Sequence, residues 1–120
     1  MADLSQVFLY LLTQTKIYHW QTTNYNKHKA SGNFYEAIEP LVDQFIETYQ
    51  GRYGQIQYER FNVSFGNLTD RQYMKVVEEF AVFLTKDVPR LVGQADSDLL
   101  NLRDEMLGQT NHAMYLLRLQ

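Results

Sequence analysis

Four side chains between residues 19 and 47 have the types and the spacing of metal ligands. His19 and His28 are nine residues apart, and Asp43 and Glu47 follow at positions four residues apart. Residues i and i+4 of a helix lie on one face, so the two carboxylates are expected to project together. Imidazole and carboxylate ligands in combination suit Fe(II), Mn(II) or Zn(II) better than Mg²⁺ or Ca²⁺. The stretch therefore predicts a transition-metal site.

Each of these side chains also has a plainer interpretation. Glu36 stands seven residues before Asp43 and extends an acidic stripe, and such stripes are usually solvated surfaces on which like charges repel each other. His19 stands at the edge of an apolar stripe, where a histidine is more often a boundary residue than a ligand. On the residues alone, a metal site and a solvated surface both remain open.

Two helices are expected to position these side chains. Apolar residues at helical spacing predict a first helix over about residues 4–22 and a second over about residues 27–50. Ser31 and Gly32 are poor helix formers, so Ser31 is an alternative N-cap of the second helix. The two histidines would then flank the turn between the helices, and the carboxylates would lie further along the second one.

The second half of the chain predicts two more helices. Thr69 or Asp70 caps the third, which is expected to end or kink at residues 86–89 because the residue before a proline avoids helical dihedrals. Asp96 or Ser97 caps the fourth, which runs to the end of the sequence. Its predicted buried seam consists of Leu99, Leu102, Met106, Ala113 and Leu117.

A crossover of residues 55–67 joins the second and third helices. Its apolar and polar residues partly alternate, which leaves two alternatives: a long loop pinned by its aromatic side chains, or a strand that pairs with another chain. Four helices with one long connection predict an all-α, antiparallel four-helix bundle with a crossover between helices 2 and 3, which is the ferritin-like arrangement. Residues 1–120 are expected to form this single domain.

Composition narrows the function classes. The chain has no cysteine, which excludes zinc-ribbon, iron–sulfur and thiol-nucleophile sites. A net charge of −3 argues against binding to a phosphate backbone, so we expect no nucleic-acid partner. The only early apolar run, residues 7–12, is too short for a membrane span, and no basic segment precedes it. We expect an intracellular protein that does not enter membranes.

The order of ligands along the chain carries a family resemblance. The sequence resembles the Dps proteins, small ferritin-like proteins that protect DNA during starvation. Their first helix ends in a His-Trp pair, matched here by His19-Trp20, and their second histidine, Asp and Glu have the spacing of His28, Asp43 and Glu47. A weaker resemblance links the chain to small ferritin-like proteins of unknown role in phages and large DNA viruses.

The Dps resemblance implies an iron-binding protein and a ferroxidase. In that family both histidines come from one subunit and both carboxylates from its two-fold mate. His19 and His28 would then face Asp43 and Glu47 of a second copy, in a homodimer or a larger homo-oligomer. Fe(II) would be the metal, with hydrogen peroxide as the usual oxidant.

The sequence departs from the Dps pattern in three places. The segment from His19 to His28 is three residues shorter than in the family. Gly32 stands where the family often has an additional acid. The lysine-rich tail with which the family binds DNA has no counterpart in this sequence.

Two competing functions follow from the same residues. One is a ferritin-like scaffold or interaction protein that keeps a degenerate, non-catalytic metal site. The other is a small-molecule pocket between helices, lined by some of the seven Phe and nine Tyr residues. Glu105 and His112 share a face of the fourth helix outside its seam, and we assign them to the surface or to a subunit contact.

Overall fold

The computed structural model describes residues 2–119, and side-chain positions from residue 3 onward. This part of the chain is helical and contains no β-strand. Its elements are α1 (Ala2–Gln21), α2 (Tyr25–Tyr53), α3 (Asp70–Val82), η1 (Phe83–Asp87), α4 (Val88–Leu91) and α5 (Ser97–Arg118). The predicted all-α architecture is therefore confirmed.

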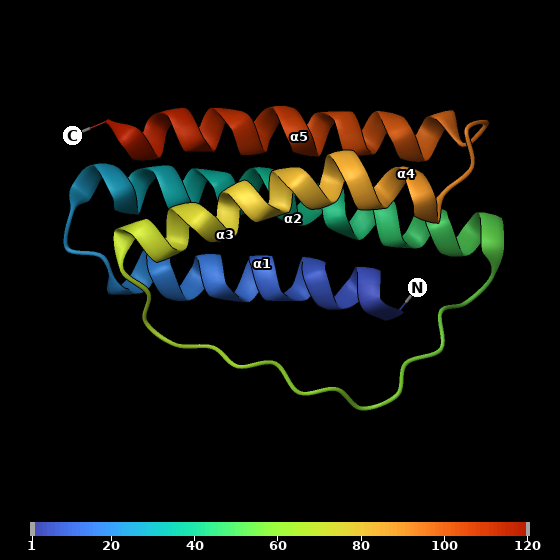
Figure 1. Ribbon diagram of the computed structural model, residues 1–120, viewed down its shortest axis with the longest axis horizontal. Helices are drawn as coiled ribbons and strands as arrows, with labels where there is room; N and C mark the ends of the chain where they lie inside the picture. Colours follow the sequence, from blue (N-terminus) through green and yellow to red (C-terminus); the bar gives the residue numbers. More distant parts are fainter. Residues whose placement is uncertain (1, 120) are drawn as a thin grey trace.

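The helices form four rods that lie side by side (Figure 1). η1 and α4 continue the line of α3, so these three elements make up one rod. α1 and α2 run in opposite directions, as do α2 and α5, whereas α2 and α3 run in the same direction. The long connection between α2 and α3 runs back along the full length of the bundle, on the outside of α1. The described helices thus form a bundle with the predicted crossover, and none of them is long and apolar enough to cross a membrane.

The core lies along the axis of the bundle and is built from the predicted apolar stripes. Phe8 of α1 is fully buried and meets three other rings edge-on, with centroid distances of 5.6 Å to Phe45, 6.0 Å to Phe80 and 5.7 Å to Phe83. One residue of α1 therefore links α2, α3 and η1. The predicted seam of α5 is buried throughout. Helical periodicity alone was enough to identify the seam of α5.

α2 begins close to the predicted residue 27 and not at the alternative N-cap, Ser31. Asn24 is the N-cap, and its side chain accepts a hydrogen bond of 2.9 Å from the backbone N–H of Lys27. Ser31 as the N-cap was wrong: it lies inside α2, fully buried, and its hydroxyl donates to the carbonyl of Lys27 at 2.7 Å. A serine bonded to the carbonyl four residues earlier tolerates a helix interior, so the helix begins two turns earlier.

Both caps in the second half of the chain lie where the sequence placed them. Thr69 and Gln72 form a reciprocal capping box at the start of α3. Asp96 is the N-cap of α5, but its carboxylate accepts from the Gly93 N–H at 2.7 Å and from the Tyr53 hydroxyl. The hydrogen bond from Tyr53 lowers the pKa of Asp96. This contact ties the end of α2 to the start of α5.

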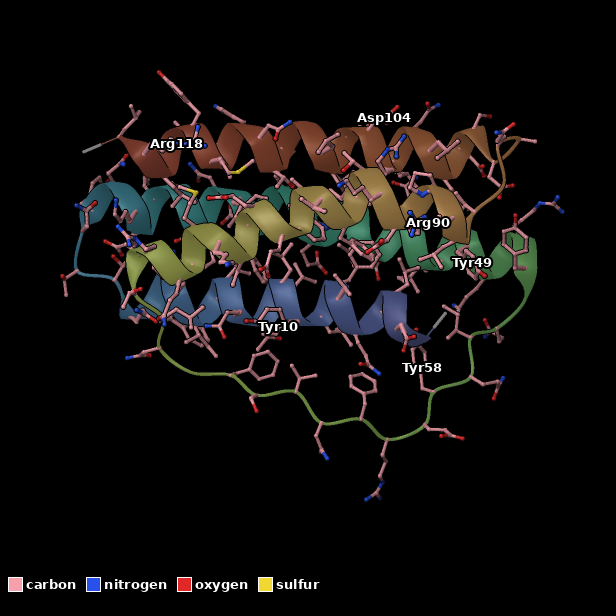
Figure 2. The ribbon with its side chains drawn as sticks, viewed as in Figure 1. Tyr10, Tyr49, Tyr58, Arg90, Asp104 and Arg118 are labelled. Atoms are coloured by element: carbon pink, nitrogen blue, oxygen red, sulfur yellow. The ribbon has the colours of Figure 1, made fainter. Side chains whose placement is uncertain are left out.

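The crossover has the irregular conformation of the loop alternative and is fixed to α1 by side chains. Tyr58 and Ser5 share a hydrogen bond of 2.6 Å, and Phe65 stacks on Tyr10 with centroids 5.9 Å apart (Figure 2). Further along, the Gln14 amide donates to the carbonyl of Gly66, and Gln21 exchanges two hydrogen bonds with the backbone of Leu68. The glutamine side chains satisfy backbone groups that have no helical partner.

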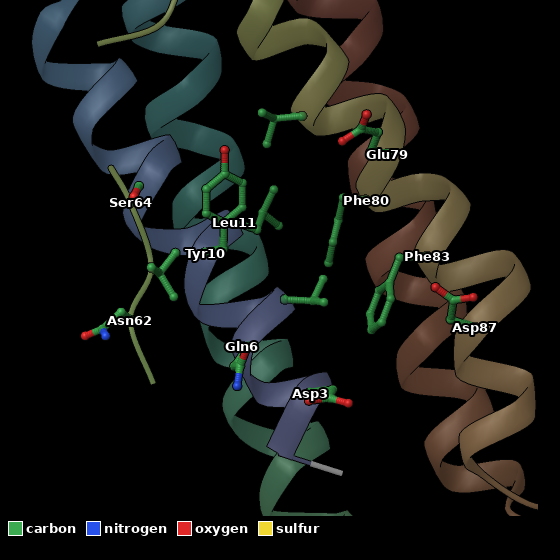
Figure 3. Close-up of a pocket in the computed structure, with 13 residues that line it drawn as sticks. Asp3, Gln6, Tyr10, Leu11, Asn62, Ser64, Glu79, Phe80, Phe83 and Asp87 are labelled. Carbon is green, nitrogen blue, oxygen red and sulfur yellow. The ribbon is translucent and has the colours of Figure 1, made fainter. Parts of the chain in front are cut away.

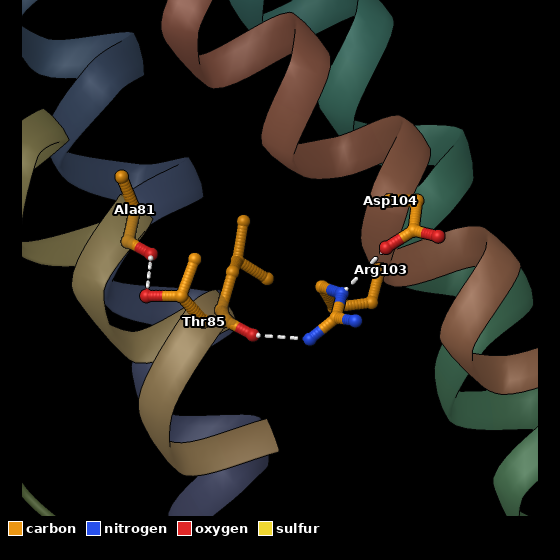
Figure 4. Close-up of polar contacts among 5 residues, drawn as sticks. Ala81, Thr85, Arg103 and Asp104 are labelled. Atoms are coloured by element: carbon orange, nitrogen blue, oxygen red, sulfur yellow. Dashed lines mark hydrogen bonds and ion pairs between the residues drawn. The ribbon is translucent and has the colours of Figure 1, made fainter. Parts of the chain in front are cut away.

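The third rod does not end at residues 86–89. The π-helix η1 runs as far as Asp87, and α4 continues the rod from Val88. The N–H of Val88 donates to the carbonyl of Phe83, five residues earlier. In this register the next carbonyl, that of Leu84, would accept from residue 89, but Pro89 has no N–H. Nη1 of Arg103 on α5 supplies the missing donor at 3.1 Å (Figure 4). An arginine from another helix therefore completes the π segment.

Replacing Arg103 with Met should lower the free energy of unfolding by about 1–3 kcal/mol, because the Leu84 carbonyl loses a charged donor in a partly buried place. Arg103 also bonds to Asp104 at 2.8 Å, but that carboxylate is exposed. Asp104→Ala should therefore change stability by less than about 0.5 kcal/mol. Urea unfolding of both variants checks the prediction. Equal losses of unfolding free energy would show that the hydrogen bond from Arg103 to the Leu84 carbonyl does not stabilise the fold.

Candidate metal centre

The two predicted histidine ligands lie side by side at one end of the bundle. His19 is in the last turn of α1, and His28 is in the first turn of α2. Their imidazole rings stack with centroids 3.9 Å apart and an angle of 18° between the planes. The short turn of residues 22–24 brings them together, so the shorter spacing between the two histidines still yields a pair.

Each histidine orients the other through its backbone. Nδ1 of His19 lies 2.7 Å from the carbonyl oxygen of His28, and Nδ1 of His28 lies 2.9 Å from the carbonyl oxygen of His19. A carbonyl oxygen only accepts hydrogen bonds, so both Nδ1 atoms must carry the proton. In a neutral imidazole this leaves the lone pair on Nε2. Both side chains thus present a metal-binding atom, held by the backbone bond typical of metal-ligating histidines.

Gly32 provides the space for the His19 ring. A Cβ atom at position 32 would lie 2.7 Å from Cε1 and 3.0 Å from Nδ1 of His19. Separations this short do not occur between carbon atoms, so any other residue would displace the ring. The sequence suggested only that Gly32 lacks the additional acid of the Dps pattern. Its role depends on a side chain from another helix, which no local signal reveals.

The two predicted carboxylate ligands lie elsewhere on the same chain. Asp43 and Glu47 are exposed on α2, and neither forms an ion pair with any residue that the structure describes. Fifteen residues of helix separate His28 from Asp43, a rise of about 22 Å. Accordingly, among residues 3–119 no group of three or more His, Asp or Glu side chains lies close enough together to hold a metal ion. One chain brings the histidines together but not the carboxylates.

Several large apolar side chains are exposed on α1 and on the crossover that runs beside it. Leu9 is 47% exposed and Tyr58 is 49% exposed, and between them lies a groove of about 250 Å³ that also includes Asp43. Trp20 is 69% exposed at the histidine end. Large exposed apolar side chains gathered on one face are typical of an interface.

A buried pair of tyrosines lies directly beneath the histidine end. Tyr18 stacks on Tyr73 with centroids 4.0 Å apart, and its hydroxyl donates to Asp70 at 2.6 Å. The hydroxyl of Tyr73 bonds to Thr15 at 2.9 Å. Burial, together with the Asp70 carboxylate in the case of Tyr18, raises the pKa of both phenols. Both stay protonated, so they brace α1 against α3 and offer no anionic ligand.

The remaining candidates lie at the surface. Glu105 and His112 are exposed on α5, in agreement with their assignment outside the bundle core. Glu36 is exposed on α2 and extends the acidic stripe toward Asp43. These side chains lack the paired, backbone-oriented geometry of His19 and His28. They therefore serve as matched controls for experiments on the candidate site.

Comparison with known protein families places the chain in a family. The sequence model of a protein family of unknown function, DUF5856, matches residues 19–117. Neither the comparison with curated proteins nor that with solved structures gives a significant match. The matched segment begins at His19 and contains all four predicted ligands and the whole of α2, the crossover and α3. The chain is therefore a member of the DUF5856 family.

Proposed function

We propose that this protein is a ferritin-like, Dps-like iron-binding protein that oxidises Fe(II) at a site shared between two copies of the chain. His19 and His28 of one subunit and Asp43 and Glu47 of its two-fold mate would be the ligands. The main supporting observation is the stacked histidine pair, because backbone carbonyls engage both Nδ1 atoms and so leave the two Nε2 atoms as the ring nitrogens that could bind a metal.

A two-fold arrangement explains how a chain with separated ligands could form a complete site. In an isologous interface, the histidine end of one α1–α2 face meets the carboxylate end of the other. The apolar side chains between the two ends, Leu9 and Tyr58 among them, would be covered in the same contact. The exposed carboxylates have no cationic partner among the described residues, which supports a role that begins only on assembly.

The ligand set suits Fe(II) as the substrate. Imidazole nitrogen and carboxylate oxygen together favour Fe(II), and carboxylates also stabilise the Fe(III) product. In the balanced reaction, two Fe(II) give up one electron each to one hydrogen peroxide, which takes up two protons and becomes two waters. The task of the protein is to hold the ions and to leave a position open for the oxidant.

Fe(II) oxidation by peroxide, followed by absorbance, tests the proposal. The wild-type protein should oxidise Fe(II) faster than buffer, and Glu47→Ala should lower apparent Fe(II) affinity by more than about tenfold. Two variants of exposed α5 residues outside the proposed ligand set, Glu105→Ala and His112→Ala, serve as controls and should match wild type. They separate loss of the site from a general loss of surface charge or imidazole.

The alternative function is a ferritin-like scaffold with a degenerate, non-catalytic site. The observation in its favour is the set of exposed apolar side chains on α1 and the crossover, Leu9, Trp20 and Tyr58, which would hold an oligomer together without any metal. It predicts an oligomer whose thermal midpoint does not respond to Fe(II) or to chelators. Oxidation by wild type at the rate of buffer, with the oligomer intact, would favour the scaffold over the ferroxidase.

A further inference from the structure

A second cavity lies between α1 and the line of α3 and η1. It has a volume of about 640 Å³, is open to solvent, and is lined by α1, the middle of the crossover, and the line of α3 and η1 (Figure 3). Its crossover wall consists of Asn62, Val63 and Ser64. Small-molecule sites typically have volumes of about 300–1,000 Å³, so the size suits an organic ligand.

The floor of the cavity is apolar and partly aromatic. Leu11, Phe80 and Phe83 are each at most 8% exposed and form its base, and Tyr10 stands at its edge. Figure 3 shows Phe80 and Phe83 projecting from the third rod toward α1. Aromatic faces carry negative potential, and they attract both apolar groups and ammonium groups.

The rim of the cavity is acidic. Asp3, Glu79 and Asp87 line it, and no Lys, Arg or His in the described part of the chain does. Within residues 3–119, none of these three carboxylates has a hydrogen bond or an ion pair to a side chain. These negative charges near aromatic rings favour positive charge in the cavity, while Arg90 lines an adjoining hollow together with Asp3 and Asp87.

The π segment contributes directly to this arrangement. Phe83 and Asp87 are its first and last residues, and both line the cavity. Single π turns are uncommon and are found frequently at functional sites. The contact from Arg103 to Leu84 that completes the segment therefore also fixes one wall of the cavity.

We propose that this cavity binds a small organic cation with an apolar body, such as an arylalkylammonium ion. The ammonium group would lie beside one part of the rim, at Glu79 or at Asp3 and Asp87, because eight helical residues separate Glu79 from Asp87 by about 12 Å. The apolar body would contact Phe80, Phe83 and Leu11. An anionic ligand of the same shape would be repelled by the rim, and a neutral one would lose the charge contribution. This proposal involves none of the four candidate metal ligands and does not depend on the proposed function.

Titration calorimetry with three phenyl compounds tests the inference on the full chain. The probes are 2-phenylethylammonium, the neutral 2-phenylethanol and the anionic 3-phenylpropionate, which share the apolar body and differ in charge. The ammonium compound should bind more tightly than the alcohol, and the carboxylate should not bind. Equal affinity for the ammonium compound and the alcohol, or no heat with any probe, would overturn the proposal.

Variants of the rim localise the binding. Glu79→Gln with Asp87→Asn should weaken binding of the ammonium probe by about two- to fivefold, because the ammonium group contacts one of these exposed carboxylates at a time and the double variant removes either contact. Glu78→Gln, one residue away and outside the cavity lining, should leave the affinity unchanged. His28→Ala should also bind the probe like wild type, so a failure of the metal site leaves this test intact. Full affinity in the doubly substituted rim would contradict the inference.

Discussion

Two inactive variants of this protein should restore Fe(II) oxidation when they share a dimer. One variant carries His19→Ala and His28→Ala, and the other carries Asp43→Asn and Glu47→Gln. If each site takes its histidines from one chain and its carboxylates from the other, a mixed dimer has one complete site and one empty site. Random pairing then yields about a quarter of the wild-type sites, because half of the dimers are mixed.

The measurement requires co-expression with two affinity tags, so that mixed dimers are purified free of the parent forms. Peroxide-dependent Fe(II) oxidation by the mixed dimer should reach about half the wild-type rate per dimer, because one of the two sites is complete. A mixed dimer of the Asp43→Asn chain with the Glu47→Gln chain is the control. Both changes fall on the same side of the interface, so neither site is complete and no activity should return.

This experiment distinguishes a metal site shared between two chains from the absence of such a site. Recovery in the histidine–carboxylate pair alone requires that ligands cross the interface. Activity retained by either parent variant would show that the altered residues are not the ligands. No recovery in any pair, despite intact mixed dimers, would contradict the shared site and favour the scaffold.

Much of the fold follows from local patterns in the sequence. The buried seam of α5 was identified from helical spacing alone, because apolar side chains on one face must be removed from water. Thr69 was recognised as a cap because its side chain accepts from its own helix, which is a contact only three residues away. Signals of this kind need no knowledge of the rest of the chain.

Features that depend on contacts between distant segments did not follow from the sequence. The π-helix at Phe83–Asp87 requires a donor from Arg103, about a full helix later in the chain. Local dihedral preferences before Pro89 correctly indicated a disturbance there, but they could not specify its form. The cavity walls likewise come from three separate segments, so no single stretch of sequence reveals them.

The candidate metal site was predictable from the sequence only in part. The spacing of His19, His28, Asp43 and Glu47 was readable, and the structure brings the two histidines together. The exchange of Nδ1–H bonds with backbone carbonyls could not be read, because it depends on the geometry of the turn. The carboxylates remain a prediction, because in the proposed site their histidine partners would come from a second chain.

Gly32→Ala should weaken metal binding while leaving the bundle at least as stable as before. Alanine favours a helix over glycine by about 0.5–1 kcal/mol, so α2 itself should gain stability. The new Cβ would occupy the place of Cε1 of His19, only 2.7 Å away, and the ring must move. Because the ring is the end of a side chain at the bundle surface, the move should cost little more than its hydrogen bond to His28.

The displaced ring no longer presents Nε2 beside that of His28, so apparent Fe(II) affinity should fall by about 10- to 100-fold. Gly108→Ala in α5 is the matched control, because a Cβ there meets open space. It should raise the thermal midpoint and leave Fe(II) binding unchanged. Thermal unfolding together with Fe(II) titration therefore separates the two roles of glycine. Wild-type affinity in Gly32→Ala would show that the position of His19 does not matter for the metal.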